Sequence, residues 1–371
     1  AIRSKKGIDE STILKERSHT FEVEDTEFFK LNGNQSGFYR VKYTPERVSK
    51  LAQSANLLSS EDRIGLVADA RALATSGYSR TSAFLELING WKLSEAEPTV
   101  WEEILTSFGG IKRAWIQQPQ AVKDALKKFN AALVEEKANE VGWNIKSDDS
   151  VLIQQLKANL YSSAVASEIP SFIDDALAKF KKYSEGDETA INPNLRGAVF
   201  RAAGLYGGEE AFNKLLKIYQ DKSSVEGLSA IRSLGYSPDA NLRAKALNFA
   251  ISGVVRTQDV SHLLASFSTH PDSIKQLWNW FKAEWDQVST IYPASLGLLA
   301  RVVGSSSAGF STEAELEDFN KFFEDKNTKT YDQTLGNTRD RVSSYINWTK
   351  KDGRDVSEWL SKHGYLEESK L

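Results

Sequence analysis

Residues that could carry out catalysis are sparse in this sequence. Its 371 residues include four histidines and no cysteine, so neither a thiol nucleophile nor a thiolate metal site can form. No histidine lies in a His-Glu-x-x-His motif, which places two zinc ligands one helical turn apart. The sharp Gly-x-Ser-x-Gly turn that presents a nucleophilic serine is also missing. We therefore expect a chain that is not an enzyme on its own and that holds no metal or other cofactor.

Three pairs of side chains, one Asp–His pair and two acidic pairs, come closest to a catalytic or metal-binding arrangement. Asp259 and His262 are three residues apart on a predicted helix, where a metal pair is geometrically possible. A histidine in the core or on the surface is the commoner reason for such spacing. The pairs Glu102-Glu103 and Asp148-Asp149 lie at predicted helix starts or loops, where the helix dipole favours acidic side chains. We expect all three pairs to be structural.

The charge balance limits the partners that the chain can have. Lysine and arginine number 47 against 50 aspartates and glutamates, which gives a net charge of -3. A nucleic-acid-binding protein needs a basic surface to displace counterions from phosphates, so no nucleic-acid partner is expected. The apolar stretches are far shorter than the ~20 residues of a membrane-spanning helix, so no membrane partner is expected either. The missing cysteines are compatible with a reducing compartment, and we expect the cytoplasm.

The first ~45 residues differ from the rest of the chain. Thr20–Val23 and Phe28–Leu31 are short β-prone runs, followed by a turn-forming cluster at 32–37. Residues 38–43, Phe-Tyr-Arg-Val-Lys-Tyr, then alternate ring or aliphatic with polar side chains, which predicts a strand–turn–strand hairpin. Because two or three strands alone are marginally stable, we expect residues 1–45 to complete a sheet whose other strands lie upstream. The absence of a methionine at position 1 also suggests a piece of a longer protein.

From Pro45 onward the pattern is helical. Ile274, Leu277, Trp278, Phe281 and Trp285 follow the spacing of one apolar stripe on a helix that begins after His270. Expected helix starts also include capping boxes at Thr99–Glu102 and Thr312–Glu315 and a cap at Ser237 before Pro238, and the glycines at 77, 109, 235 and 253 are expected to end helices.

Helical segments of 10–18 residues recur, separated by short turns. They are predicted at 61–76, 81–91, 119–141, 151–166, 173–183, 194–205, 209–221, 224–234 and 239–252. Serial helical hairpins of about 40 residues predict a mainly α fold, a superhelix of the HEAT or armadillo kind over residues 46–371. The concave side of such a superhelix is its usual binding surface. From the residues alone, a free-standing scaffold that binds a protein partner is one possible function.

A series of short segments, in order along nearly the whole chain, is similar to one family of enzymes. Residues 29–32, Phe-Lys-Leu-Asn, followed by 37–43 resemble the strands that end the β-sandwich of gluzincin-class zinc aminopeptidases, and 62–69 resemble the opening helix of their C-terminal domain. Further segments resemble the puromycin-sensitive and alanine/arginine aminopeptidase branch: Thr99-Val100-Trp101, Gly142-Trp143, 277–282 with Trp285, Gly309-Phe310 and Phe322-Phe323.

The resemblance implies a zinc aminopeptidase of four domains, of which this chain holds the last two in part or in full. The zinc and the catalytic residues would belong to an upstream catalytic domain of the same polypeptide, which would be this chain's partner. The helical domain would cover the active site and wall the chamber that binds the peptide substrate. Arg301 resembles a family arginine that projects toward the substrate channel, where it would bind the C-terminal side of the peptide.

The residues leave other roles open. The alternative for Arg301 is an ion pair on a helix surface. Tyr39 and Arg40 would contact the catalytic domain or pack in the sheet, and Lys157 and Asn159 are candidates for the concave side.

Overall fold

The computed structural model describes residues 1–367 except 12, 24, 222–223 and 293–296. At the N-terminus lies a small antiparallel sheet of β1 (Ile2–Ser4), β2 (Gly7–Asp9) and β3 (Phe29–Leu31), in the order β2-β1-β3. β1 pairs with both neighbours, with Ile2 opposite Asp9 in β2 and Leu31 in β3. The β-prone run at 28–31 is therefore confirmed as a strand.

The predicted hairpin is wrong, because residues 20–23 and 38–43 form no strand. The polar groups of the second segment bond to other partners. The Val41 N–H donates to the Asp69 carboxylate (3.0 Å), and the Tyr43 hydroxyl accepts from the Leu31 N–H (2.9 Å) and donates to the Leu31 carbonyl (3.2 Å). A tyrosine side chain thus takes the place on β3 that the expected strand would have occupied.

The remainder of the described chain is helical. Its α-helices are α1 (Pro45–Gln53), α2 (Ser60–Thr75), α3 (Thr81–Trp91), α4 (Pro98–Ala114), α5 (Gln120–Val141), α6 (Val151–Ala166), α7 (Pro170–Ser184), α8 (Arg196–Tyr206), α9 (Gly208–Asp221), α10 (Ser224–Ile231), α11 (Ala240–Ala250), α12 (Val260–Ala265), α13 (Pro271–Ala283), α14 (Trp285–Ile291), α15 (Leu298–Ser306), α16 (Glu313–Phe323) and α17 (Asp332–Lys362). The mainly α fold is confirmed. None of these helices is both long and apolar enough to cross a membrane.

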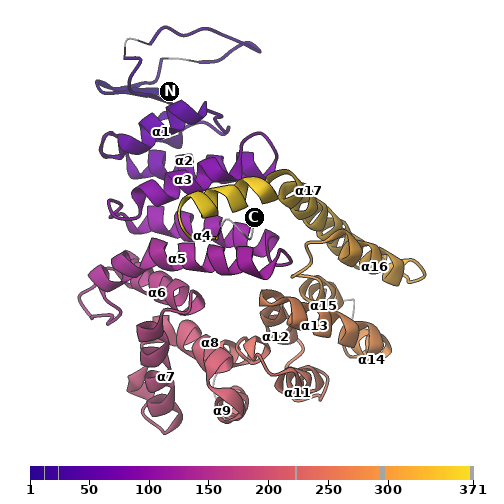
Figure 1. Ribbon diagram of the computed structural model, residues 1–371. Helices are drawn as coiled ribbons and strands as arrows, with labels where there is room; N and C mark the ends of the chain where they lie inside the picture. Colours follow the sequence, from indigo (N-terminus) through magenta and orange to yellow (C-terminus); the bar gives the residue numbers. More distant parts are fainter. Residues whose placement is uncertain (12, 24, 222–223, 293–296, 368–371) are drawn as a thin grey trace.

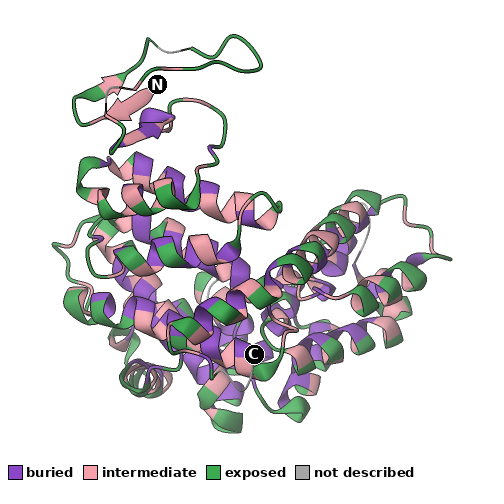
Figure 2. Ribbon diagram, turned by 45° about the horizontal axis from the view of Figure 1, so that its top comes forward, coloured by how far each residue is buried: buried purple, intermediate pink, exposed green. Residues whose placement is uncertain are grey.

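The helices stack along an arc (Figure 1). One continuous row runs through the stack, in which α2, α4, α6, α8, α10, α12 and α15 each contact the next. Buried residues follow the faces by which neighbouring helices meet, and exposed residues cover the outer faces and the loops (Figure 2). The superhelix of helical hairpins predicted from the sequence matches this arrangement.

The last helix changes the shape from an open stack to a closed circuit. α17 contacts α15 at one end of the row and α2 to α5 at the other (Figure 1). Trp348 and Trp359 anchor it there: the Trp348 indole N–H donates to the Thr81 hydroxyl (2.8 Å) and that of Trp359 to the Glu86 carboxylate (2.8 Å). Nothing in the helical periodicity indicated this return.

Buried charges hold the N-terminal sheet on α2. Asp62, which is fully buried, accepts from the Asn34 N–H (2.7 Å) and pairs with the Lys30 ammonium at 3.0 Å and with the Arg3 guanidinium. About two turns further along the same helix, Asp69 pairs with Arg40 (3.1 Å). The two aspartates tie both the sheet and the following segment to one face of α2.

Some predicted helix ends are confirmed and others are displaced. The Thr312–Glu315 capping box is present, with the Thr312 hydroxyl accepting from the Glu315 N–H (3.3 Å), and His270 caps α13. The capping box at Thr99 and the cap at Ser237 are each wrong by two residues, because the residue before α4 is Glu97 and the residue before α11 is Asp239. The stripe of Ile274, Leu277, Trp278 and Phe281 is buried on α13, whereas Trp285 begins α14.

Of the glycines predicted to end helices, Gly77 and Gly109 behave differently. Gly77 ends α2 in the left-handed region (φ 82°), as predicted. Gly109 does not end a helix, because it lies with Gly110 in the interior of α4. A glycine in a helix interior costs about 1 kcal/mol relative to alanine, so the pair lowers the stability of α4.

Candidate functional site

Arg301 lies on α15 with its side chain exposed. The apolar residues of this helix, Leu298, Leu299, Val302 and Val303, are buried and fix its orientation in the stack. The Arg301 guanidinium makes no hydrogen bond and no ion pair with any described residue. The surface ion pair that was the alternative role is therefore not found in the part of the chain that the structure describes.

Two neighbouring helices of the row add basic groups beside Arg301. Arg232, just after α10, directs its Nε and Nη2 atoms at His262 Nδ1 on α12, at 3.3 and 3.1 Å. Because a guanidinium only donates, Nδ1 must accept, which leaves the proton of a neutral ring on Nε2. Burial lowers the pKa of His262, and the charges of Arg232 and Arg301 lower it further, against the opposing effect of Asp259.

This group of Arg232, His262 and Arg301, hereafter the Arg301 group, has the chemistry of an anion site. A guanidinium can hold a carboxylate through two parallel hydrogen bonds. Arg301 supplies the free guanidinium, and the neutral His262 ring supplies a further N–H donor. The sequence identified Arg301 through its resemblance to a family residue. It did not identify Arg232 and His262 as neighbours, because they are 30 residues apart and come from different helices.

Asp259 and His262 do not form a metal pair in the structure. Asp259 is buried, and its Oδ2 accepts from Arg256 Nε (2.7 Å) and the Tyr219 hydroxyl (3.0 Å). Among the described residues, no group of three or more histidines, aspartates and glutamates is arranged to hold a metal ion. The residues present therefore do not fit the zinc of an aminopeptidase, and no step of metal chemistry is assigned to them.

The remaining residues named from the sequence lie apart from the Arg301 group. Lys157 is buried, and its ammonium donates to Asp149 (2.6 Å) and to the Asn144 carbonyl (3.0 Å). The hydrogen bond from Lys157 is the largest cause that lowers the pKa of Asp149. Lys157 thus stabilises the loop before α6 and presents no free charge, whereas Asn159 is half-buried.

The N-terminal candidates do not pack in a sheet. Arg40 pairs with Asp69, and Tyr39 is 53% exposed beside a fully exposed Phe38. Of the acidic pairs, Glu103 accepts from the Ser107 hydroxyl (2.6 Å) within α4, and Asp149 is held as described above.

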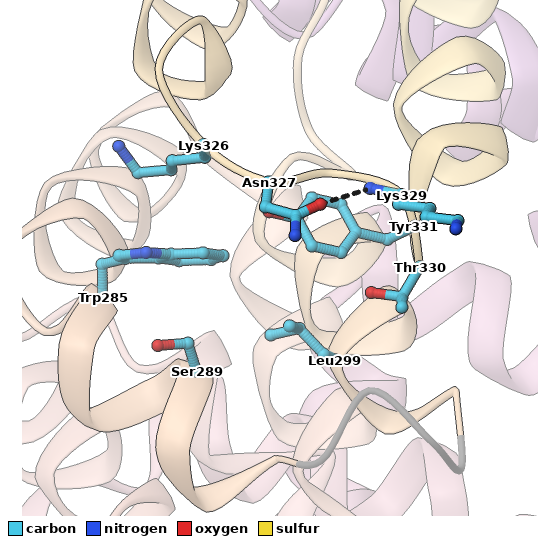
Figure 3. A pocket seen from close by; sticks show the side chains of 8 residues that line it. All are labelled: Trp285, Ser289, Leu299, Lys326, Asn327, Lys329, Thr330 and Tyr331. Atoms are coloured by element: carbon cyan, nitrogen blue, oxygen red, sulfur yellow. Dashed lines mark hydrogen bonds between the residues drawn. The ribbon is translucent and has the colours of Figure 1, made fainter.

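A pocket of about 430 Å³ is lined in part by Leu299 of α15 (Figure 3). Trp285 and Tyr331 form aromatic walls and Lys326 and Lys329 lie at its rim, with Ser289, Leu299, Asn327 and Thr330 completing the lining. Arg301 is not among the lining residues, although Leu299 of the same helix is. The pocket and the Arg301 group are therefore separate features of the surface.

Residues 28–344 match the family model described as the ERAP1-like C-terminal domain. Among curated proteins, aminopeptidase 2, mitochondrial, of Saccharomyces cerevisiae is 37% identical over 366 residues, covering 98% of this chain and 38% of the relative. The alanine/arginine aminopeptidase of the same yeast is 38% identical over 366 residues, covering 98% of this chain and 43% of the relative.

A more distant relative extends the match to plants. Aminopeptidase M1-A of Oryza sativa subsp. japonica is 29% identical over 331 residues, covering 87% of this chain and 37% of the relative. The resemblance to aminopeptidases is thereby confirmed over the whole length of the chain. The chain spans about two fifths of the length of the relatives that it matches.

Proposed function

Because the chain belongs to the ERAP1-like C-terminal domain family, we propose that it is the non-catalytic C-terminal part of a zinc aminopeptidase, an enzyme that removes residues from the N-terminus of peptides. In this proposal the helical arc covers the active site of an upstream catalytic domain and forms a wall of the peptide-binding chamber. The names of the yeast and rice relatives support the activity.

The observation that carries the proposal is the unpaired guanidinium of Arg301. It lies exposed on the continuous row of helices, next to a second arginine and a neutral histidine, without a carboxylate partner among the described residues. We propose that it binds the C-terminal carboxylate of a peptide whose N-terminus is at the active site. Such a contact would select peptides over free amino acid derivatives.

The same proposal assigns the two segments of the chain. Residues 1–45 would be the last strands of a β-sandwich, and 46–371 the helical domain. The small sheet supports this division, because three strands of three residues each are too few to be stable alone. The ties from Asp62 and Asp69 would then hold the sandwich at a fixed angle to the helical domain.

We propose that the zinc lies in the catalytic domain and that the enzyme works in the cytoplasm. The catalytic ligands of a zinc peptidase would be supplied entirely by that domain. The lack of cysteine in all 371 residues suits a reducing compartment. Fractionation of the native enzyme would decide the location, and recovery from mitochondria would contradict the cytoplasm.

The test uses the complete enzyme with Arg301→Ala. KM should rise by about tenfold for peptides of eight or more residues, because a bidentate contact to a carboxylate is worth about 1.4–3 kcal/mol. KM for a single-residue chromogenic substrate should change less than twofold, since such a substrate does not reach the distal site. The matched control is Arg354→Ala, an exposed arginine on α17 whose partner is Glu358 (2.6 Å).

Amidating the peptide C-terminus sharpens the test. The amide should raise KM of the wild-type enzyme and leave that of Arg301→Ala unchanged. Equal effects of Arg301→Ala on peptides and on the chromogenic substrate would contradict the proposed contact.

A further inference from the structure

A second concentration of positive charge lies on the row, around α4. Arg71 on α2, Lys112 and Arg113 on α4, and Arg201 on α8, hereafter the α4 cluster, come from helices connected through the row. None of the four side chains makes a hydrogen bond or an ion pair with a described residue. The chain as a whole has more acidic than basic residues. The excess of positive charge at the α4 cluster is therefore a local feature.

Two of the positive charges of the α4 cluster lie over aromatic rings instead of beside carboxylates. The Lys112 ammonium lies 5.6 Å from the centre of the Phe108 ring, and the Arg201 guanidinium 4.6 Å from that of Tyr236. Arg201 Nε is buried and has no hydrogen-bond partner. A buried donor without a hydrogen bond is destabilising. A ligand oxygen that accepted from Arg201 Nε would remove this cost.

Lys112 is surrounded by apolar groups and by other positive charges. Burial lowers the pKa of Lys112 to about 8, and the charges of Arg201 and Arg113 act in the same direction. No carboxylate acts in the opposite direction. A lysine on a solvated helix face would be hydrated and would have its ordinary pKa, so Lys112 is not simply a surface lysine.

The glycine pair of α4 lies directly beside these groups. A β-carbon at Gly109 would lie 3.8 Å from Arg113 Nη1, and one at Gly110 would lie 3.8 Å from Arg71 Cδ and 3.9 Å from Arg113 Nη2. These are ordinary contact distances, so the packing of this chain would accept alanine at both positions. The helix nevertheless keeps two glycines. Close approach of a ligand to backbone is a common reason for such glycines.

We propose that the α4 cluster binds a multivalent oxyanion, a group with two or more negative charges on phosphate or carboxylate oxygens. Lys112 and the three guanidiniums would donate to its oxygens, and the glycine pair would leave room for it against α4. The inference rests on these side chains alone and does not depend on the chain being part of an aminopeptidase. The α4 cluster differs from the Arg301 group in its residues, in the helices that carry them and in the number of negative charges that its ligand would need.

Two probes distinguish the sources of such an anion. Inorganic pyrophosphate tests a free phosphate, and the blocked peptide acetyl-Ala-Glu-Glu-Ala-amide tests acidic side chains, with no terminal carboxylate for Arg301 to bind. Each is titrated into the 371-residue chain by calorimetry at constant ionic strength. We expect saturable binding of at least one probe at one site per chain.

The variants locate the binding. Lys112→Met keeps the apolar stem over Phe108, and Arg113→Gln keeps a polar side chain of similar length; each should weaken binding at least tenfold. The control Lys217→Met removes one charge from the exposed face of α9 and should change the affinity less than twofold. No saturable binding of either probe, or equal affinity in all three variants, would overturn the proposal.

A second measurement needs no variant. The depressed pKa makes Lys112 partly neutral at pH 8, so it should be acetylated by acetyl-N-hydroxysuccinimide faster than Lys217. A saturating bound probe should slow the acetylation of Lys112 at least fivefold, as measured by mass spectrometry of peptides, and should leave Lys217 unchanged. Failure of the bound probe to protect Lys112 would place the anion elsewhere and overturn the assignment.

Discussion

Asp352 in the last helix caps the third helix from a distance of 271 residues in the sequence. Its Oδ2 accepts from the Thr81 N–H (3.0 Å) and from the Thr81 hydroxyl (2.7 Å). One turn later, Asp355 accepts from the Ser82 N–H (2.8 Å) and the Ser82 hydroxyl (2.8 Å). The residue before α3, Arg80, makes no capping hydrogen bond with its own side chain. Two backbone donors that a local cap would satisfy are thus satisfied by α17.

Asp352→Ala should lower the free energy of unfolding by about 2–4 kcal/mol, because it leaves the Thr81 donors buried without an acceptor. Asp352 is fully buried, so water is a poor substitute. The free energy of unfolding is measured by urea denaturation, with circular dichroism as the signal. The control Asp340→Ala, at an exposed position on the same helix, should change stability by less than about 0.5 kcal/mol. Equal losses in both variants would show that the capping contact contributes nothing.

Asp62→Asn should destabilise the chain by about 3–5 kcal/mol, because it leaves the buried ammonium of Lys30 without its charge partner. Adding Lys30→Met should restore part of the loss, since the unpaired charge is then gone. The exposed control Asp174→Asn should be neutral. If the double variant is less stable than Asp62→Asn, the ammonium matters more through its bonds to the Leu31 and Asn32 carbonyls.

The same aspartate gives a prediction on the acid side. Burial acts to raise the pKa of Asp62, but the charges of Lys30 and Arg3 outweigh it and hold the pKa below its ordinary value. A carboxyl group whose pKa is lower in the folded state stabilises above its unfolded pKa of about 3.9 and loses that contribution as the pH falls through the folded value. Asp62→Asn should therefore lose less stability between pH 5 and pH 2 than the wild type. Parallel acid profiles would contradict this.

Lys112→Met should stabilise the chain at pH 7 by about 1–2 kcal/mol, a value reduced for partial solvent access. The pKa of Lys112 falls from 10.5 to about 8 on folding, so its charged form is disfavoured in the folded state. The unfolded chain then binds more protons between pH 8 and 10.5, and wild-type stability rises over that range. The difference between the two proteins should shrink from pH 8 to pH 10.5. A constant difference would rule out the titration of Lys112 as its cause.

Gly110→Ala should stabilise the chain by about 0.5–1 kcal/mol, because alanine favours the helix and its β-carbon has room. Gly77→Ala is the contrasting control. Gly77 has a φ of 82°, a left-handed conformation that costs an alanine about 1 kcal/mol or more, so this variant should be less stable than the wild type. Thermal denaturation of both variants gives the comparison. Destabilisation by Gly110→Ala would mean that α4 needs the glycine for its own packing.

The helices were predictable because their signals are local. The segments 81–91 and 151–166 agree with α3 and α6 to the residue, since apolar periodicity and caps lie within each segment. The strand predicted at 38–43 was wrong because tertiary contacts determine the conformation of this segment. The Val41 N–H donates to Asp69 on α2 rather than to a neighbouring strand. The return of α17 was missed for the same reason. Asp352 and Thr81 are 271 residues apart, and neither lies in a local pattern that indicates a contact between them.

For the candidate sites, the sequence revealed single residues and not their groupings. Arg301 was found through a family resemblance, whereas His262 was expected to be a structural histidine, with a metal pair with Asp259 as the alternative. The α4 cluster had a local signal that was misread, because Gly109 was predicted to end a helix and lies inside α4. That Arg71 lies beside Gly110 and that the charge of Arg201 acts on Lys112 depend on how α2 and α8 stack beside α4 and α6, which no local pattern encodes.

The closed circuit made by α17 fixes how many helical pairs this fold can contain. In an open solenoid each unit contacts only its neighbours, so a hairpin can be gained or lost while the rest keeps its geometry. Here an added or deleted pair would change the arc that α17 has to span, and Asp352 would no longer reach Thr81. Differences in length among proteins that keep this closure should therefore fall in the loops between helices, while the number of helical pairs stays constant.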